Sequence, residues 1–316
     1  MRPLIVIRGV PKIDFMRWHV FGFAFSLALT ALTIGLFLTA GLNFGIDIVG
    51  GTLIEARTTT GPADLAAMRA KLDSLKLGDA SLQQFGSPND VLIRLPQQPG
   101  GDAAQMKAIQ MARDALGAGI EYRRQEVVGP SVGSELITAG VLATVLALGA
   151  ILIYVWFRFE WQFGVGATIA TLHDVVTTVG LFVIFQLEFN LTTLAAILTI
   201  AGYSINDTVV IYDRVRESMR KYRTMPFREL INLALNETLS RTILTVSTVA
   251  LAVLSLLLFG GEVLKGFSIA MLWGIVIGTY SSLFIAAPLL YYVQPNRRAI
   301  AKEPEPTTAR AERAPR

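Results

Sequence analysis

Long apolar runs dominate the chain, and short polar segments separate them. A helix needs about 20 mostly apolar residues to cross the hydrocarbon core of a bilayer. Six segments reach roughly this length: His19–Leu42, Leu136–Phe157, Phe163–Gln186, Leu191–Tyr212, Ile243–Gly260 and Phe267–Val293. The pattern therefore predicts a polytopic α-helical membrane protein with six transmembrane helices.

The first apolar segment, residues 19–42, is expected to stay in the mature protein as transmembrane helix 1. It is too long for the core of a signal peptide. Leu38 also occupies a position where a cleavage site favours a small residue.

A different pattern fills residues 43–135, between the first two spans. "GTLIEAR" and "IEYRRQEVV" read as strands, and "ASLQQF" and "DVLIRL" predict a hairpin across "GSPN". "ADLAAMRAKLDSL" and "AAQMKAIQMARDAL" repeat apolar residues at helical spacing. The resulting βαββαβ order is that of the ferredoxin-like split unit. We expect a small α+β domain here, since about 90 residues suffice for one core.

Basic residues predict the orientation of the spans, because cytoplasmic loops carry an excess of Lys and Arg. Such residues gather in segment 1–18, between Arg214 and Arg228, and in the tail 294–316, whereas the opposite short loops hold only Lys265. Both termini are then cytoplasmic, and residues 43–135 are extracytoplasmic, that is, periplasmic in a bacterial inner membrane. The polar, Pro-containing tail is predicted to be disordered.

The span region 136–293 includes a cytoplasmic amphipathic segment near 225–240. An apolar stripe runs along it through Phe227, Leu230, Ile231, Ala234 and Leu235. A short helix lying on the membrane surface fits this stripe. A connector packed on the helical bundle fits it equally well.

Composition narrows the classes of function. The chain is 53% hydrophobic and 16% charged, against about 25% charged in a typical soluble domain. It has no cysteine and only two histidines, which excludes disulfides, thiolate metal sites and histidine clusters. A net charge of +4 does not indicate nucleic acid, because the basic residues flank the spans. No nucleophile–base set appears, so an enzyme is not expected.

Asp207 is the most informative polar residue, because it lies inside the fourth apolar run. An ionised Asp at a helix centre costs roughly 2.5–3.5 kcal/mol on insertion scales. Burial favours the neutral form of a carboxyl group, so such a residue can exchange protons while its charge alters local packing. Tyr203, Ser204 and Asn206 add polar groups nearby.

Arg241, at the cytoplasmic start of the fifth span, is a candidate counter-ion for Asp207. Spacing alone favours the alternative that it snorkels and anchors the span. His173 and Asp174 form a second polar pair, in the middle of the third span. They could relay protons, since histidine titrates near pH 6.5. A hydrogen-bonded pair that only fixes helix packing is an equal alternative.

Five motifs in order resemble the SecF family: "FGIDIVGGT", "VGPSVGSEL", "HDVV", "AGYSINDTVVIYDRVRE" and "TLSRT". The resemblance runs from about Asn43 to Pro288. It implies half of an RND-type transporter, whose other half is SecD. The pair is thought to use the proton-motive force to draw preproteins outward from the SecYEG channel, with YajC and YidC as further candidate partners. The family associates the Asp of "ND" and the Arg before the fifth span with proton transfer, and these match Asp207 and Arg241.

One motif departs from the family pattern. Members usually have Asp-Phe-Thr-Gly-Gly after the first span, whereas this chain has Asp47-Ile48-Val49-Gly50-Gly51. Gly50 and Gly51 are expected to form a turn before the first strand rather than a phosphate loop, because no GxGxxG follows. Together with Asp47, and with Gly129, Pro130 and Gly133 of the second motif, they are candidate hinge or structural residues between the external domain and the spans.

The resulting hypothesis is a proton-driven motor subunit without a bound cofactor. Ionised Asp207 would pair with Arg241, and protonation would release the pair. Sodium could replace the proton, since a carboxylate with Asn, Ser and Thr oxygens also suits a hard cation. Two alternatives remain: a structural subunit that only stabilises the translocon, and half of a proton-driven exporter of small molecules.

Overall fold

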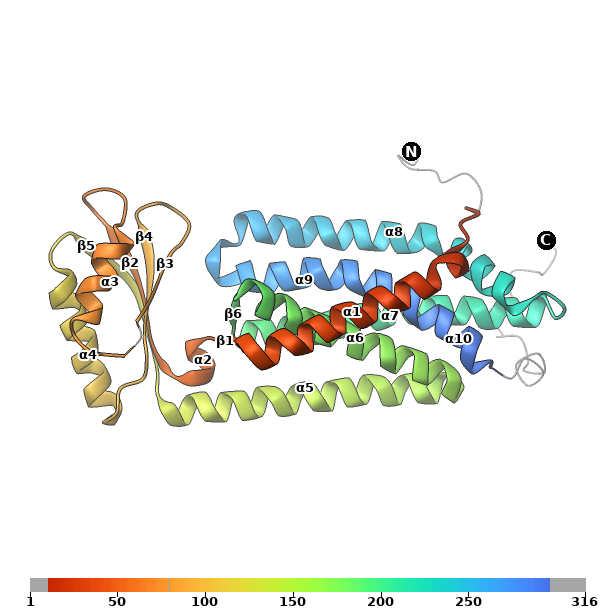
Figure 1. Cartoon of the computed structure of the whole chain (residues 1–316), viewed down its shortest axis with the longest axis horizontal. Coiled ribbons are helices and arrows are strands. Elements are labelled where there is room, and N and C mark those ends of the chain that lie inside the picture. The colour runs from red at the N-terminus through yellow and green to blue at the C-terminus, as the bar shows by residue number, and fades with distance from the viewer. Residues whose placement is uncertain (1–10, 79, 296–316) are drawn as a thin grey trace, which may run out of the picture.

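The computed structural model of the chain describes residues 11–78 and 80–295, without the side chains of residues 130–132, 262 and 263. The molecule is elongated, with a small sheet domain at one end of a bundle of long helices (Figure 1). We call the bundle end beside this domain the domain end, and the opposite end the far end. The predicted disordered tail lies outside the described residues from 296 onward, as do residues 1–10 of the N-terminal segment.

Within the described residues, six helical stretches are long and apolar enough to cross a membrane. They are α1 (Phe15–Ala40), α5 (Pro130–Arg158), α6 (Trp161–Phe185), α7 (Leu191–Lys221), α8 (Phe227–Phe259), and a last span made of α9 (Gly261–Ser281), η1 (Ser282–Ala286) and α10 (Ala287–Val293). The six predicted helices are thus confirmed. Two of them extend well beyond their apolar runs, because the flanking polar segments are rich in Arg, Glu, Met and Leu, which favour helices.

The last span changes its winding at η1, which is a π-helical turn. Pro288 follows this turn. A proline lacks the N–H of a helical residue, and its ring presses on the carbonyl four residues earlier, so a widened turn accommodates it. The Tyr212 hydroxyl donates a hydrogen bond of 3.2 Å to the carbonyl oxygen of Ala286. The distortion is therefore tied to α7.

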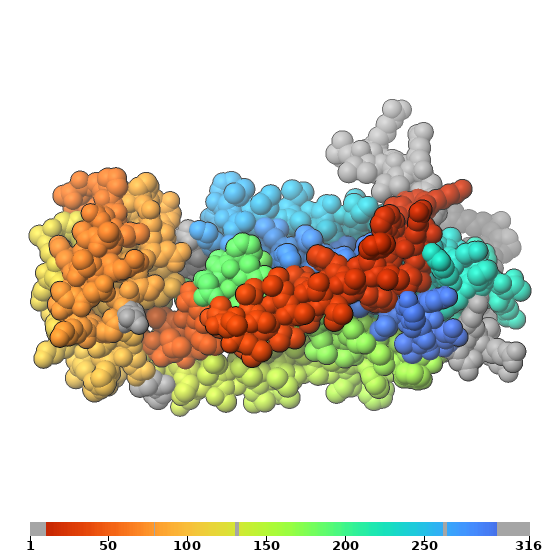
Figure 2. Space-filling view, in the orientation of Figure 1, coloured from red at the N-terminus to blue at the C-terminus, as the bar shows by residue number. Residues whose placement is uncertain are grey.

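Burial separates inner helices from outer ones. In the most apolar part of each helix, 56% of α6, 44% of α7 and 61% of the last span are buried, against none of α5 and 11% of α8. Small residues let the inner helices approach closely, since a Cβ on Gly278 would lie 2.9 Å from the Ser204 Cβ. The helix α1 lies across the outside of the bundle (Figure 2).

The sheet domain has the predicted βαββαβ order. Its elements are β2 (Gly51–Thr58), α3 (Leu65–Asp73), β3 (Ser81–Gln84), β4 (Asp90–Leu95), α4 (Gly101–Leu116) and β5 (Ile120–Val128). The strands lie in the order β3-β4-β2-β5, and every neighbouring pair is antiparallel. The helices α3 and α4 cover the sheet face that points away from the bundle (Figure 1). The core between these helices and the sheet includes the buried residues Ile54, Leu72, Ile93 and Ile109.

Residues 43–49 belong with the bundle rather than with the sheet. The short strand β1 (Asn43–Phe44) pairs in parallel with β6 (Glu188–Phe189), which lies between α6 and α7. The single-turn helix α2 (Ile46–Val49) follows, and its Ile48 is buried beside Leu181 and Phe182. The sheet domain proper therefore begins at Gly51.

The segment near 225–240 is the first part of α8. Leu230, Ile231 and Leu235 are completely buried in the bundle core. On the same helix, the Asn236 side chain accepts a 2.9 Å hydrogen bond from the backbone N–H of Ile13. This arrangement agrees with the connector packed on the bundle, and the apolar stripe is not free to lie on a membrane surface.

Candidate functional site

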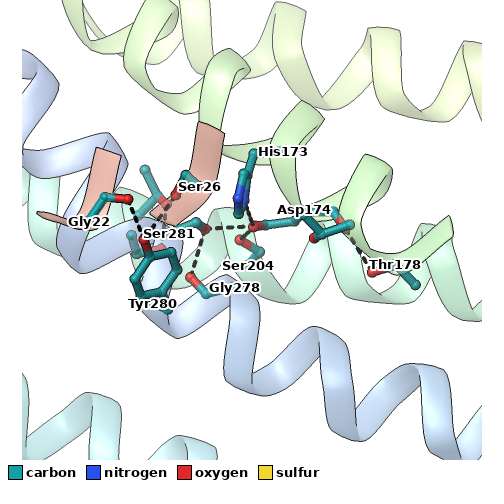
Figure 3. A network of polar contacts seen from close by, with 12 residues as sticks. Gly22, Ser26, His173, Asp174, Thr178, Ser204, Gly278, Tyr280 and Ser281 are labelled. Carbon is teal, nitrogen blue, oxygen red and sulfur yellow. Dashed lines mark hydrogen bonds and ion pairs between the residues drawn. The ribbon is translucent and has the colours of Figure 1, made fainter. Parts of the chain in front are cut away.

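Asp174 on α6 is the centre of a buried polar cluster, and none of its surface is exposed. Its Oδ2 accepts hydrogen bonds from the hydroxyls of Ser204 on α7, at 2.5 Å, and Ser281 on α9, at 2.8 Å. His173 Nδ1 lies 3.2 Å from Oδ1. Figure 3 shows these side chains converging on one carboxylate from three different helices. The cluster therefore ties the inner helices together at a single ionisable group.

The local sequence explains why this cluster is compact. The hydroxyl of Thr178, one turn after Asp174, donates a 2.7 Å hydrogen bond to the Asp174 carbonyl oxygen, so this hydroxyl is satisfied within α6. Gly278 lets α9 approach Ser204 closely. Beside the cluster, Tyr280 donates to the Gly22 carbonyl oxygen at 2.6 Å and accepts from Ser26 at 2.9 Å (Figure 3). These two bonds attach α1 to α9.

Asp207 lies on α7, one turn beyond Tyr203, and only 5% of its surface is exposed. Its Oδ2 and the Tyr203 hydroxyl are both buried without a hydrogen-bond partner among the described residues. A buried polar atom without a partner is uncommon and calls for an explanation. Asp207 therefore differs from Asp174, whose carboxylate is fully engaged.

Asp207 and Arg241, the predicted pair, do not form an ion pair in this structure. Arg241 is exposed on α8 and interacts electrostatically with the Asp207 carboxylate, but no direct ion pair joins the two groups. Asn206, the neighbour of Asp207 in the motif, points out of the bundle and is exposed. Thus the predicted polar residues separate into two groups: one holds His173, Asp174 and Ser204, and the other holds Tyr203 and Asp207, with Arg241 acting on the Asp207 carboxylate.

The candidate hinge glycines lie where the sheet domain joins the bundle. Gly50 and Gly51 have φ values of 76° and 126°, which other residues adopt only with strain. A Cβ on Gly133 of α5 would lie 3.3 Å from the carbonyl oxygen of Ile48 in α2. Asp47 is in the first turn of α2, and Gly129 caps the start of α5 with ordinary extended backbone. The side chain of Pro130 lies outside the described residues.

Sequence reasoning missed Ser281, and with it the contribution of the last span. Thr208 and Ser282 were missed as well, although their hydroxyls lie 2.8 Å apart between α7 and η1. The available signal was the pair of serines in "TYSSLF", inside an otherwise apolar run. Hydroxyl groups are common glue between spans, so this pair did not stand out from the sequence alone.

The chemistry of the site is that of buried carboxylates among hydroxyls. No group of three or more His, Cys, Asp or Glu side chains in the described part of the chain is arranged to hold a metal ion. Two carboxylates on adjacent inner helices can each take up a proton, or bind a hard cation with the help of serine oxygens.

Comparison with known proteins places this geometry in a family. Residues 108–296 match the family described as "Protein export membrane protein SecD/SecF, C-terminal", and residues 35–61 match the "SecD/SecF GG Motif". The protein translocase subunit SecF of Rickettsia rickettsii is 46% identical over 295 residues, covering 91% of this chain and 94% of the relative. SecF of Cereibacter sphaeroides is 44% identical over 301 residues, covering 92% and 93%.

Among solved structures, the chain is similar to SecDF of Thermus thermophilus, described as a translocon-associated membrane protein. The TM-score is 0.81 at 35% identity, and the match covers 92% of this chain but 40% of the SecDF chain. A SecDF structure in a super-membrane-facing form gives a TM-score of 0.69 at 35% identity. The fold is therefore that of one part of SecDF, and the chain belongs to the SecF family of protein translocase subunits.

Proposed function

We propose that this chain, together with SecD, uses the proton-motive force to promote late steps of preprotein translocation through SecYEG and release on the far side of the membrane. Membership of the SecF family supports the export role. The observation that carries the motor role is Asp207, a buried carboxylate with an unpaired oxygen. A carboxylate that served only as glue between helices would have its oxygens satisfied, as those of Asp174 are.

The proposed cycle alternates two arrangements of α7 and α8. When Asp207 is ionised, it attracts Arg241 and draws the two helices together. When Asp207 is protonated, the attraction is lost and the helices separate. The present geometry, with Arg241 exposed and apart from Asp207, fits the separated arrangement. One charge crossing 100 mV supplies about 2.3 kcal/mol, which matches usual coupling energies of about 1–3 kcal/mol.

The Asp174 cluster is the proposed supporting relay beside Asp207, the residue at which the change of charge takes place. Ser204, which donates to Asp174, stands three residues before Asp207, about 4.5 Å along the helix axis. A change in the charge of either carboxylate therefore acts on the same part of α7. His173 and the surrounding hydroxyls would support proton transfer, and the same oxygens would suit sodium in its place.

A face of α7 supports SecD as a partner. Four exposed residues recur along one side of this helix: Ala195, Thr199, Gly202 and Asn206. Small and polar residues of this kind suit close packing of another helix better than contact with lipid tails. The SecDF chain of Thermus thermophilus extends well beyond the part that this chain matches, which leaves room for a second helical half.

We also propose a multi-pass location in the bacterial inner membrane, with the far end of the bundle in the cytoplasm and the sheet domain in the periplasm. The connection from the end of α7 to the start of α8, at the far end, is rich in arginine: it holds Arg214, Arg216, Arg220, Arg223 and Arg228. Such an excess of arginine supports the cytoplasmic assignment of that end.

Secretion into vesicles under an imposed proton gradient tests the proposal with an Asp207→Asn variant. The carboxamide keeps the size of the side chain but cannot ionise, so assembly with SecD should persist. The gradient-dependent part of secretion should fall by about tenfold or more, the effect of about 1.4 kcal/mol of lost coupling. Repeating the assay with a sodium gradient identifies the coupling ion.

Asp213→Asn is the matched control, because Asp213 is a half-exposed carboxylate on the same helix. It should leave secretion unchanged. If Asp207→Asn secretes at the wild-type level under the gradient, the chain is a structural subunit rather than a motor. If the gradient drives small-molecule efflux but not secretion, the exporter alternative holds.

A further inference from the structure

An ion pair joins the sheet domain directly to the bundle. Arg94 on β4 pairs with Glu188 of β6, a residue far away in the sequence. The Arg94 side chain is 12% exposed and the Glu188 side chain 25%, so both are largely shielded from solvent. Exposed ion pairs contribute little, but a shielded pair is costly to separate because each charge then loses its partner.

The position of Arg94 in the sheet aims it at the bundle. Its neighbours Ile93 and Leu95 are fully buried, and both belong to the core of the sheet domain under α3 and α4. Successive side chains on a strand point to opposite faces of the sheet. Arg94 therefore projects from the face opposite α3 and α4, as its pairing with Glu188 of the bundle requires. That face of the sheet is turned toward the bundle in Figure 1. Other arginines of the domain pair within it, as Arg57 does with Asp90 and Arg124 with Glu126.

Glu188 is held rigidly between two inner helices. It lies in the connection from Gln186, which caps α6, to Asn190, whose side chain caps the start of α7. Pairing of β6 with β1 adds a second support, because the N–H of Gly45 donates to the carbonyl oxygen of Phe189 at 2.8 Å. A shift of α6 or α7 must therefore move Glu188.

The electrostatic surroundings make this carboxylate dependent on Arg94. Burial raises the pKa of Glu188 above its ordinary value, Arg94 opposes the rise, and Asp47 adds to it. Arg94 is thus the cation that favours the ionised form, while the neighbouring Asp47 of α2 disfavours it. If the two partners separate, Glu188 is left partly buried beside another carboxylate.

The two chain connections between the sheet domain and the bundle contain glycines, which permit backbone rotation. Gly50 and Gly51, with positive φ, connect α2 to β2, and Gly129 connects β5 to α5. Glycine allows rotation that other residues resist. A side-chain contact between the sheet and the bundle then has a large influence on the orientation of the domain.

We propose that Arg94 and Glu188 are a positioning pair, which fixes the sheet domain on the domain ends of α6 and α7 and transmits shifts of these helices to it. The transmission rests on the proposed function, whereas the positioning does not. The helices α6 and α7 carry Asp174 and Asp207 respectively, so the pair connects both buried carboxylates to the part of the molecule outside the bundle.

A distance measurement tests the positioning in the intact complex. The chain has no cysteine, so with a cysteine-free SecD, nitroxide labels attach only at introduced sites. Met106→Cys on α4 and Phe259→Cys at the end of α8 are suitable, since Met106 is 57% and Phe259 86% exposed. Pulsed electron paramagnetic resonance of the reconstituted complex then reports the distance from the domain to the bundle.

Charge reversal should separate the pair, and a double reversal should restore it. Arg94→Glu and Glu188→Arg should each shift or broaden the distance distribution, and the double variant should return it to the wild-type form. Arg124→Glu is the matched control, an arginine on the same sheet face with partners inside the domain, and it should leave the distribution unchanged. If both single reversals keep the wild-type distribution, or if the double variant does not restore it, the positioning role is wrong.

Secretion by the same variants tests the transmission. Each single reversal should lower gradient-driven secretion by about fivefold or more, the lower end of usual coupling effects, and the double variant should recover it. If the single reversals move the domain but secretion stays at the wild-type level, the transmission role is wrong. Failure of the proposed function itself would appear separately, as full secretion by Asp207→Asn.

Discussion

Asp174 and Asp207 are both buried, but their surroundings assign them different tasks. Asp174 receives hydroxyl donors from two other helices, whereas Asp207 keeps one oxygen without a partner. A satisfied carboxylate stabilises one packing of the helices, and an unsatisfied one favours any rearrangement that brings it a cation or a proton. The switching residue is therefore expected to be Asp207, with Asp174 holding the inner helices around it.

At the same scale, the serine donors of Asp174 should contribute measurably to stability. Ser204→Ala or Ser281→Ala removes one hydrogen bond to a buried carboxylate, at a cost of about 1–3 kcal/mol in the free energy of unfolding. Thermal unfolding of the purified protein in detergent measures the loss. Ser255→Ala is the control, because Ser255 is exposed and bonds only to the backbone of its own helix. Equal melting temperatures for all three variants would contradict the role given to the cluster.

Some residues of the site could be predicted from the sequence, and others could not. Asp207 and Asp174 could be identified because a carboxylate inside an apolar run is expensive. Ser281 could not, since a hydroxyl changes the hydropathy of a span very little. Arg94 was equally hidden, because an arginine on the outward face of a strand is ordinary. Its significance depends on Glu188, whose proximity is set by the tertiary fold.

At the scale of elements, periodicity predicted most of the structure. Long apolar runs identified the six membrane helices, and the alternation of strand and helix patterns identified the βαββαβ domain. The pairing of β1 with β6 was not predictable, because two-residue strands have no period to detect. The continuous helix from Phe227 to Phe259 was divided in the prediction, since its first half is amphipathic and its second half apolar.

The sheet domain should show a specific sensitivity to acid. Hydrogen bonds from Arg57 and Ser87 hold the pKa of Asp90 well below its usual range. A carboxylate whose pKa is lowered by folding stabilises the fold above its unfolded pKa of about 3.9, and this contribution is lost as the pH falls further. Protection of amides 51–128 against hydrogen exchange should therefore weaken below about pH 4.

Asp90→Asn should remove this sensitivity and lower the protection already at neutral pH. Asp73→Asn, at an exposed position on α3 of the same domain, should retain the wild-type pH profile. Hydrogen-exchange mass spectrometry of the full chain, corrected for the intrinsic pH dependence of exchange, makes the comparison. An Asp90→Asn profile that coincides with the wild type at every pH would show that the Arg57–Asp90 pair does not set the acid stability of the domain.

At the scale of the whole molecule, the architecture suits transmission between two ends. The sheet domain sits at one end of the helical bundle (Figure 1), and the buried carboxylates of Asp174 and Asp207 lie on the inner helices of that bundle. Rigid helices carry small displacements over their full length, and glycines at the junction let the domain follow them. The exposed small and polar face of α7 is where we propose that SecD packs, whereas the exposed apolar surfaces of α5 and α8 suit contact with lipid.

In the proposed mechanism Asp207 changes its charge when the gradient acts on the complex, and difference infrared spectroscopy detects such a change at the carboxyl group itself. Spectra of reconstituted SecDF are compared before and after a proton gradient is imposed. We predict a band of a protonated carboxyl group that is missing in Asp207→Asn and retained in Asp213→Asn. If the carboxyl band is unchanged in Asp207→Asn, Asp207 is not the switching residue, because the proton is then taken up elsewhere.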